Sequence, residues 1–290
     1  MVIIREARGD DFERVYRLLL EFKNPHLTKE HWRQLFVDHS HLQNDNFGWV
    51  LVDGDDVVGF VSTILSERTI RGETVRLCNL SNWIVKDKYR AHSLALHGKV
   101  VADRSVTVTN LSPTPQVLKL IEKLGFTVMD KSERIILPVI AARAFTDRCE
   151  ILTKKSAIEG ALEGERLRFF RDHQLPYNRH VLLRTHLGDC YVMMNRSWKT
   201  IRGNLRLPFA RVHHIGAPDI FVQYLEKLVV RVVASFKVVA MIVDDRMLRG
   251  AVPRHSFMRP GGERKAAFRS EKLAAEDIDG LYTEAVLLNY

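Results

Sequence analysis

Apolar and polar positions in the first half of the chain follow the two spacings of regular secondary structure. One face of residues 11–22 carries Phe12, Val15, Leu18, Leu19 and Phe22. This spacing predicts an amphipathic helix. The turn signal Asp53-Gly-Asp-Asp56 separates two strand-like runs and predicts a hairpin. The expected elements are a strand at 2–6, helices at 11–22 and 29–39, strands at 48–52, 57–65 and 74–85, a helix at 91–104, a strand at 106–110, a helix at 114–124 and a strand at 131–137.

The second half repeats this succession more faintly. Its expected elements are a helix at 156–173, strands at 180–185 and 190–195, a turn at Arg202-Gly203, a strand at 205–214, a long apolar helix at 219–236, a strand at 238–243 and a closing strand at 281–288. We therefore predict an α/β fold class with two units in tandem, each a mixed, mostly antiparallel sheet flanked by helices. The predicted boundaries are 1–138 for the first unit, 139–153 for a connection and 154–290 for the second.

Charge and cysteine content narrow the classes of partner. The net charge of +9 is uneven, with +2 in residues 1–145 and +7 in residues 146–290. No basic stripe interleaved with aromatic residues is visible, so we expect no specific nucleic-acid partner. No apolar stretch reaches the ~20 residues that a membrane span needs. Cys78, Cys149 and Cys190 lie far apart and lack metal-ligand spacing, which favours a reducing cytoplasm and no bound metal. A homodimer is compatible with this composition.

The most informative stretch is Trp83-Ile-Val-Lys-Asp-Lys-Tyr-Arg-Ala-His-Ser-Leu-Ala95. A strand ends at Val85, a short basic turn follows, and a helix begins near Ala91. The first backbone N–H groups of a helix are unpaired and attract anions, so this junction predicts a phosphate-binding loop.

This stretch resembles the coenzyme A loop of the GCN5-related N-acetyltransferase (GNAT) family, Val-x-Pro-x-Tyr-Arg-Gly-x-Gly-x-Gly/Ala. The matching and small-residue positions are Val85, Tyr89, Arg90, Ala91, Ser93 and Ala95. Asp87 stands where the family has Pro, and no glycine remains. The order of elements over residues 1–138 is also that of the family, so the resemblance implies two GNAT-like folds, the second diverged.

The resemblance implies acetyl-CoA or another acyl-CoA as co-substrate, with its pyrophosphate on the backbone N–H groups of His92–Ala95. The residues expected to bind it are Trp83, Ile84, Val85, Arg90, Ala91, His92, Ser93, Leu94, Ala95 and Asn110. His92 is either a phosphate contact or an ordinary surface histidine.

The family's usual acid and base are missing. The strand Leu77-Cys-Asn-Leu-Ser-Asn-Trp-Ile-Val85 carries no carboxylate, and Ile121 stands where the family has a Tyr that protonates the thiol. The catalytic residues are therefore unidentified. Polar candidates near the expected strand split are Asn79, Ser81 and Ser112. Candidates for a base from the second half are Asp189, Asp219, Asp244 and Asp245. A third option is that water and backbone groups suffice for transfer, with no catalytic side chain.

These observations predict an acyl-CoA-dependent N-acyltransferase, an acetyltransferase above all, that acts on a small, anionic, amine-bearing acceptor. A non-catalytic acyl-CoA-binding or scaffold protein with a vestigial site is the alternative. A basic loop around Pro260-Gly-Gly262 is a candidate cover for the acceptor; its arginines are Arg254, Arg259, Arg264 and Arg269. We assign the cofactor to the first half and expect residues 1–145 alone to bind coenzyme A.

Overall fold

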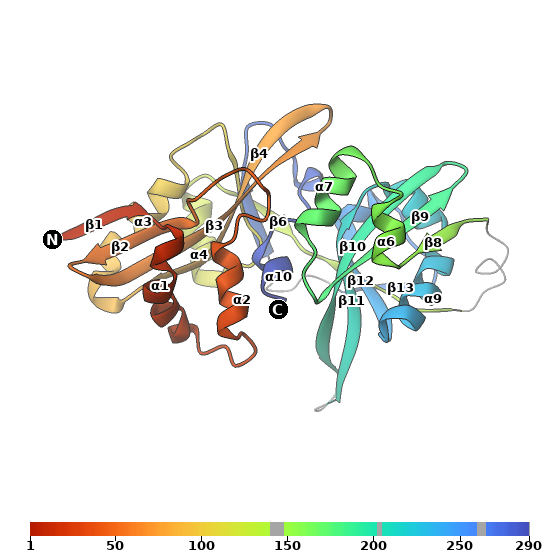
Figure 1. Ribbon diagram of the computed structural model, residues 1–290, viewed down its shortest axis with the longest axis horizontal. Helices are drawn as coiled ribbons and strands as arrows, with labels where there is room; N and C mark the ends of the chain where they lie inside the picture. The colour runs from red at the N-terminus through yellow and green to blue at the C-terminus, as the bar shows by residue number, and fades with distance from the viewer. Residues whose placement is uncertain (140–147, 202–204, 260–264, 290) are drawn as a thin grey trace.

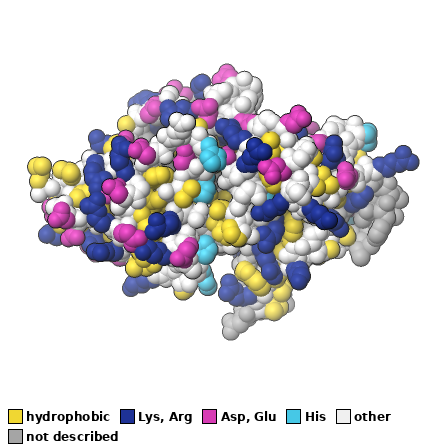
Figure 2. Space-filling view, in the orientation of Figure 1, with side chains coloured by type: hydrophobic (Ala, Val, Ile, Leu, Met, Phe, Trp, Pro, Cys, Tyr) yellow, Lys and Arg dark blue, Asp and Glu magenta, His cyan; other side chains and the backbone are white. Residues whose placement is uncertain are grey.

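The computed structural model describes residues 1–139, 148–201, 205–259 and 265–289. It contains two mixed sheets of seven strands each, and helices flank both (Figure 1). The predicted α/β class is confirmed. On the face drawn in Figure 2, Lys and Arg side chains lie on both halves among Asp and Glu, and histidines appear along the seam between the halves.

The first sheet has the order β1-β2-β3-β4-β5-β14-β6. Its strands are β1 (Val2–Glu6), β2 (Gly48–Asp53), β3 (Asp56–Ile70), β4 (Glu73–Val85), β5 (Thr107–Asn110), β14 (Lys265–Arg269) and β6 (Thr127–Asp130). All neighbours are antiparallel except β4 and β5. One face packs on α1 (Phe12–Leu19) and α2 (Lys29–Arg33), and the other on α3 (Ser93–Val100) and α4 (Pro115–Lys123).

The second sheet has the order β13-β7-β12-β11-β10-β9-β8. Its strands are β8 (Glu150–Leu152), β9 (Asn178–Thr185), β10 (Gly188–Ile201), β11 (Leu205–Ile215), β12 (Ala240–Asp244), β7 (Glu133–Ile136) and β13 (Ser256–Arg259). Helices α6 (Lys155–Glu159) and α7 (Gly164–Asp172) contribute to the core shared with the first half. Helices α8 (Pro218–Gln223) and α9 (Leu225–Phe236) pack on the opposite face.

The two halves exchange strands. The strand predicted at 131–137 was expected to close the first unit, but β7 lies between β12 and β13 in the second sheet. Its place in the first sheet is taken by β14, which pairs with both β5 and β6. The strands therefore do not divide between the sheets at residues 139–153. Residues 1–145 alone lack β14, which separates β5 from β6. The expectation that this piece binds coenzyme A by itself stays a prediction.

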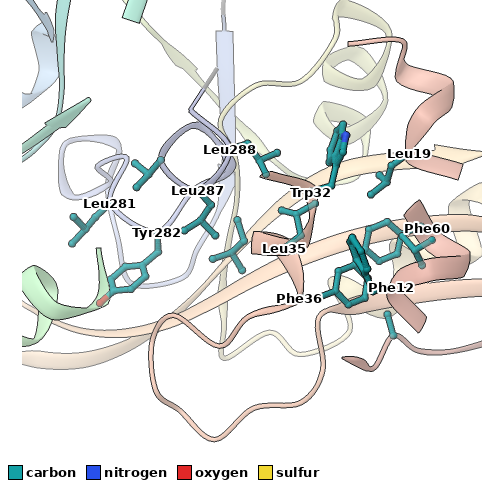
Figure 3. Packing of buried hydrophobic residues seen from close by; sticks show 14 of the residues in the cluster. Phe12, Leu19, Trp32, Leu35, Phe36, Phe60, Leu281, Tyr282, Leu287 and Leu288 are labelled. Atoms are coloured by element: carbon teal, nitrogen blue, oxygen red, sulfur yellow. The ribbon is translucent and has the colours of Figure 1, made fainter. Parts of the chain in front are cut away.

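The closing strand predicted at 281–288 is also wrong. This segment forms the short helix α10 (Glu284–Leu287), which begins after Thr283 and lies between the two halves (Figure 1). The Thr283 carbonyl accepts hydrogen bonds from the backbone N–H groups of Val286 and Leu287. Figure 3 shows Leu287 and Leu288 on the side of Trp32 and Leu35, and Leu281 and Tyr282 farther from them. The Tyr282 ring packs on Phe169 and His173 of the second half. The segment is largely buried because both halves cover it.

Other predicted elements are shorter than expected. The helix predicted at 156–173 is interrupted between α6 and α7, where Gly164 adopts a positive φ of 55°. The helix predicted at 219–236 is split at Tyr224 into α8 and α9, and the helix predicted at 91–104 ends at Val100. The turn at Arg202-Gly203 and the loop centre Pro260–Gly262 with Arg264 lie outside the described residues. Within the described chain, no helix has the length and apolar character to cross a bilayer.

Candidate functional site

The predicted phosphate loop connects β4 to α3. The Lys86 N–H donates to the Val58 carbonyl at 2.9 Å, and a 3₁₀ turn, η4 (Asp87–His92), leads directly into α3. The Tyr89 hydroxyl donates to Asp53 at 2.8 Å and ties the turn to β2. Among the described residues no side chain caps the N-terminus of α3. The junction therefore keeps the electrostatics of an anion-binding loop.

The side chains of this loop are open to solvent. Those of Ala91, His92, Leu94 and Ala95 are exposed, and Ser93 is half-buried. Arg90 is also exposed and forms an ion pair with Asp87 at 2.8 Å. Ala and Ser, which have short side chains, occupy the small-residue positions of the loop.

The strands β4 and β5 pair over a short stretch only. The parallel register runs from Leu77 opposite Thr107 to Asn79 opposite Thr109. Beyond Asn79, β4 continues to Val85, whereas β5 ends at Asn110. A β-bulge between β3 and β4 places Asn82 at a positive φ of 48°. The strands therefore part between the phosphate loop and Asn79, and bulges of this kind often stand next to active sites.

A buried carboxylate lies where the strands part. The Asn79 side-chain N–H donates to Glu284 Oε2 at 2.5 Å, and the Ser112 hydroxyl donates to Glu284 Oε1. The Thr109 hydroxyl donates to Asn79 Oδ1 at 3.1 Å and orients the amide. Asn79 is 3% exposed and Glu284 0%, whereas Ser112 is exposed. Two candidates from the sequence, Asn79 and Ser112, are thus brought together by a residue of α10.

Sequence reasoning missed Glu284. The feature that could have revealed it is a single carboxylate inside the apolar run Leu281–Leu288, a run whose pattern predicts a closing strand. A charged side chain is rarely buried unless it has a function or a partner. Glu284 therefore places a carboxylate beside β4 from the other end of the chain.

The four aspartates proposed as bases from the second half do not join this cluster in the described contacts. Asp244 pairs with Arg246 at 2.7 Å, and Asp245 pairs with Arg134 at 2.5 Å. Asp189 lies 3.7 Å from Arg184. Asp219 stands in the first turn of α8.

The other candidates take various positions around the opening. Ser81 accepts a hydrogen bond from the Asn82 side chain, and Asn110 Oδ1 accepts from the Ser112 N–H at 3.4 Å. Ile84 and Val85 are half-buried residues of β4. Trp83 stacks on His97 with ring centroids 4.7 Å apart. Burial, together with the charge of Arg269, lowers the pKa of His97 to about 4, so this ring is neutral.

The helix that follows β5 lacks the family's proton donor. Ile121 is fully buried in the core between α4 and the sheet. Thr114 caps α4 by accepting from the Val117 N–H at 3.3 Å. Gly125, at a φ of +85°, and the buried Phe126 close the helix, as their positions in the family pattern imply.

An ion-pair cluster anchors the segment that carries Glu284. Asp279 accepts two hydrogen bonds from the Arg68 guanidinium, at 2.6 and 3.0 Å, and lies 2.7 Å from His214 Nδ1. Arg68 belongs to β3 and His214 to β11, so the cluster joins both sheets to the C-terminal segment. Burial pushes the pKa of Asp279 upward, but the Arg68 charge and the His214 hydrogen bond hold it well below its ordinary value.

The predicted basic loop is partly described. Arg254 precedes β13, Arg259 ends it, and Arg269 of β14 donates to the Val101 carbonyl. Arg269 therefore braces the end of α3. In the part of the chain that the structure describes, no three His, Cys, Asp or Glu side chains are grouped as metal ligands.

No family model matches the chain, and no curated protein matches it significantly. Solved structures match over most of its length. A GCN5-related N-acetyltransferase from Anabaena variabilis aligns with a TM-score of 0.59 at 12% identity, over 92% of this chain and 72% of its own. A GCN5-related N-acetyltransferase from Kribbella flavida aligns with a TM-score of 0.57 at 12% identity, over 92% of this chain and 70% of its own. The chain has a GNAT-like fold. Saccharomyces cerevisiae N-myristoyltransferase with bound myristoyl-CoA aligns with a TM-score of 0.50 at 10% identity, over 97% of this chain and 83% of its own.

Proposed function

We propose that this protein is an acyl-CoA-dependent N-acyltransferase whose general base is Glu284. The acyl-CoA, acetyl-CoA above all, would lie with its pyrophosphate on the backbone of His92–Ala95 and its thioester in the opening between β4 and β5. The acceptor would be a small, anionic molecule that carries an amine. The GNAT-like fold and the myristoyl-CoA bound in a neighbour of similar fold support an acyl-CoA as co-substrate.

The position of Glu284 carries the proposal. A thioester is attacked only by a neutral amine, so a group within reach must remove a proton from the ammonium. Glu284 is held at the strand opening by two side-chain hydrogen bonds, from Asn79 and Ser112. A positioned base contributes about 10²–10⁴ in rate, and holding both reactants together contributes more.

Ser112 connects the buried carboxylate to solvent. Its exposed hydroxyl can accept a proton from the acceptor ammonium while it passes its own proton to Glu284 Oε1. The neutral nitrogen then forms the new N–C bond, and the C–S bond breaks. The second proton, which the nitrogen loses as the amide forms, neutralises the departing thiolate. This route needs no donor at position 121, where Ile121 offers none.

Two features favour the non-catalytic alternative, an acyl-CoA-binding or scaffold protein. The phosphate loop contains no glycine, and the family's Tyr is replaced by a buried Ile121. Neither feature removes the backbone donors or the carboxylate, so we favour the enzyme.

Calorimetry with acetyl-CoA, followed by an acetyl-transfer assay on amino acids, amino sugars and basic peptides, tests the proposal. We expect binding, transfer to a small anionic amine, and a Glu284→Gln variant that binds acetyl-CoA normally but transfers at least 100-fold more slowly. Glu276→Gln is the matched control, because Glu276 lies on the same segment and its side chain is 59% exposed. Binding without any transfer would support the scaffold alternative; no binding at millimolar ligand would refute both.

A further inference from the structure

A second feature of the opening is the amino group of Lys131. This residue lies between β6 and β7, where the chain crosses from the first sheet to the second. Its Nζ donates to the carbonyl of Leu111 at 2.8 Å, one residue before Ser112. Among the described residues no carboxylate forms an ion pair with it. Lys131 as a residue is half-buried.

The charged neighbours of Lys131 are already engaged. Arg246 holds Asp244 at 2.7 Å, and Arg211 holds Glu133 at 2.8 Å. Glu284 is bonded by Asn79 and Ser112. An ammonium has three donors, and one of those of Lys131 is used in the described contacts. In the described contacts, the charges of this group that lack an oppositely charged partner are therefore the Lys131 ammonium and the Glu284 carboxylate. One positive and one negative group side by side match the carboxylate and the ammonium of an aminocarboxylate.

His213 adds an unsatisfied polar atom to the same place. Its side chain is buried on β11, two residues from Arg211, and its Nε2 has no hydrogen-bond partner among the described residues. Its Nδ1 faces the C-terminal segment, since a Cβ at position 280 would lie 3.1 Å from it. Burial and the charges of Arg211 and Lys131 lower its pKa to about 3, so the ring is neutral and can offer one N–H.

We infer that Lys131 binds the carboxylate of the acceptor whose amine is deprotonated at Ser112 and Glu284. The inference rests on the proposed function and makes the substrate an aminocarboxylate, such as an amino acid. A single ammonium with one neutral imidazole suits a monoanion. A phosphate dianion is usually held by arginine forks, and both nearby guanidiniums are paired with carboxylates.

The pH dependence of acceptor binding follows from the surroundings of Lys131. The groups that face it are Asp244 and Arg246 after β12, Arg211 and His213 on β11, and Glu284 on α10. Burial lowers the pKa of Lys131 to about 8, against the raising effect of Asp244 and Glu284. The ammonium is thus lost as pH rises past 8, and the KM for an aminocarboxylate should rise there. A Lys131→Arg variant stays charged, so its KM should stay flat to pH 9.5.

Matched acceptors test the inference. An amino acid panel and the corresponding amino acid amides are compared at saturating acetyl-CoA, with aminoethylphosphonate as a third arm. We expect kcat/KM to favour the acids about 10- to 100-fold, the size of one charged hydrogen bond. Lys131→Met should remove this preference, Lys131→Arg should keep most of it, and the exposed Lys154→Met should leave it unchanged. Equal rates for acids and amides, or a preference for the phosphonate, would overturn the inference.

A binding measurement separates this inference from the proposed function. N-acetylated amino acids, the expected products, are titrated calorimetrically into wild type and Lys131→Met, with thermal melts as the folding check. Loss of binding in a folded Lys131→Met supports the carboxylate site even if no transfer is detected. Transfer that is insensitive to Lys131→Met and Lys131→Arg overturns the site and leaves the acyltransferase proposal standing.

Discussion

Replacing Asp279 by Asn should destabilise the whole molecule, because Asp279 joins both sheets to the C-terminal segment. Its carboxylate accepts two hydrogen bonds from Arg68, which is 9% exposed, and lies 2.7 Å from His214. The Asn side chain would leave the buried guanidinium without a counter-charge. Removing one partner of a buried ion pair costs ~3–5 kcal/mol, and the 14% exposure of the Asp279 side chain places our expectation at about 3 kcal/mol.

Urea unfolding at pH 7, followed by tryptophan fluorescence, measures this loss. Glu276→Gln is the control, since its pair with Arg71 spans 3.7 Å on the surface and should contribute less than about 0.5 kcal/mol. A double variant, Arg68→Met with Asp279→Leu, should lose less than Asp279→Asn, because no charge is left buried alone. A loss below about 1 kcal/mol in Asp279→Asn would refute the anchoring role.

The pH dependence gives a second check on the same variant. The pKa of Asp279 is lowered in the folded state, so its contribution to stability is present above the unfolded pKa of ~3.9 and is lost as pH falls through the folded value. The stability difference between wild type and Asp279→Asn should therefore be the same at pH 7 and pH 5. It should shrink only below about pH 4. A difference that already halves by pH 5 would contradict this assignment.

Three further outcomes follow from the site and the topology. Ser93→Trp should abolish acetyl-CoA binding in calorimetry, because the indole would fill the loop. Ser156→Trp, at an exposed position, is the control and should leave binding unchanged. Retained affinity in Ser93→Trp would place the pyrophosphate elsewhere. Ser112→Ala should lower kcat about 10-fold or more with an unchanged acetyl-CoA affinity, and an unchanged kcat would exclude the serine relay. A fragment of residues 1–145 should unfold without a cooperative transition by circular dichroism, because it lacks β14, and a sharp melt would show that this strand is dispensable.

Features set by neighbours in sequence could be predicted. The hairpin turn at Asp53–Asp56 connects β2 and β3, and the run to Ala95 forms the expected strand, turn and helix. Each depends on backbone conformations and spacings within about ten residues, which the sequence displays directly. The polar candidates Asn79 and Ser112 could be named for the same reason, since Asn79 lies within one predictable strand and Ser112 just after another.

Features set by partners that are distant in sequence could not be predicted. The strands β7 and β14 are short, and nothing in their local sequence says which sheet accepts which strand. The run Leu281–Leu288 is mostly apolar, and periodicity cannot distinguish a buried strand from a short buried helix. Glu284 was missed because its partners lie 205 and 172 residues away in sequence.

The exchange of strands makes the candidate site a property of the whole chain. The phosphate loop comes from the first half, whereas Glu284 arrives on a segment that both halves hold, through Asp279 and the apolar contacts of Leu281 and Leu287. The base therefore takes its position only when both sheets are complete and the segment is seated between them. A change that loosens this segment should lower kcat through misplacement of Glu284, while the loop in the first half keeps its affinity for the co-substrate. On the proposed mechanism, the second half is therefore needed for transfer even though the predicted phosphate loop lies in the first.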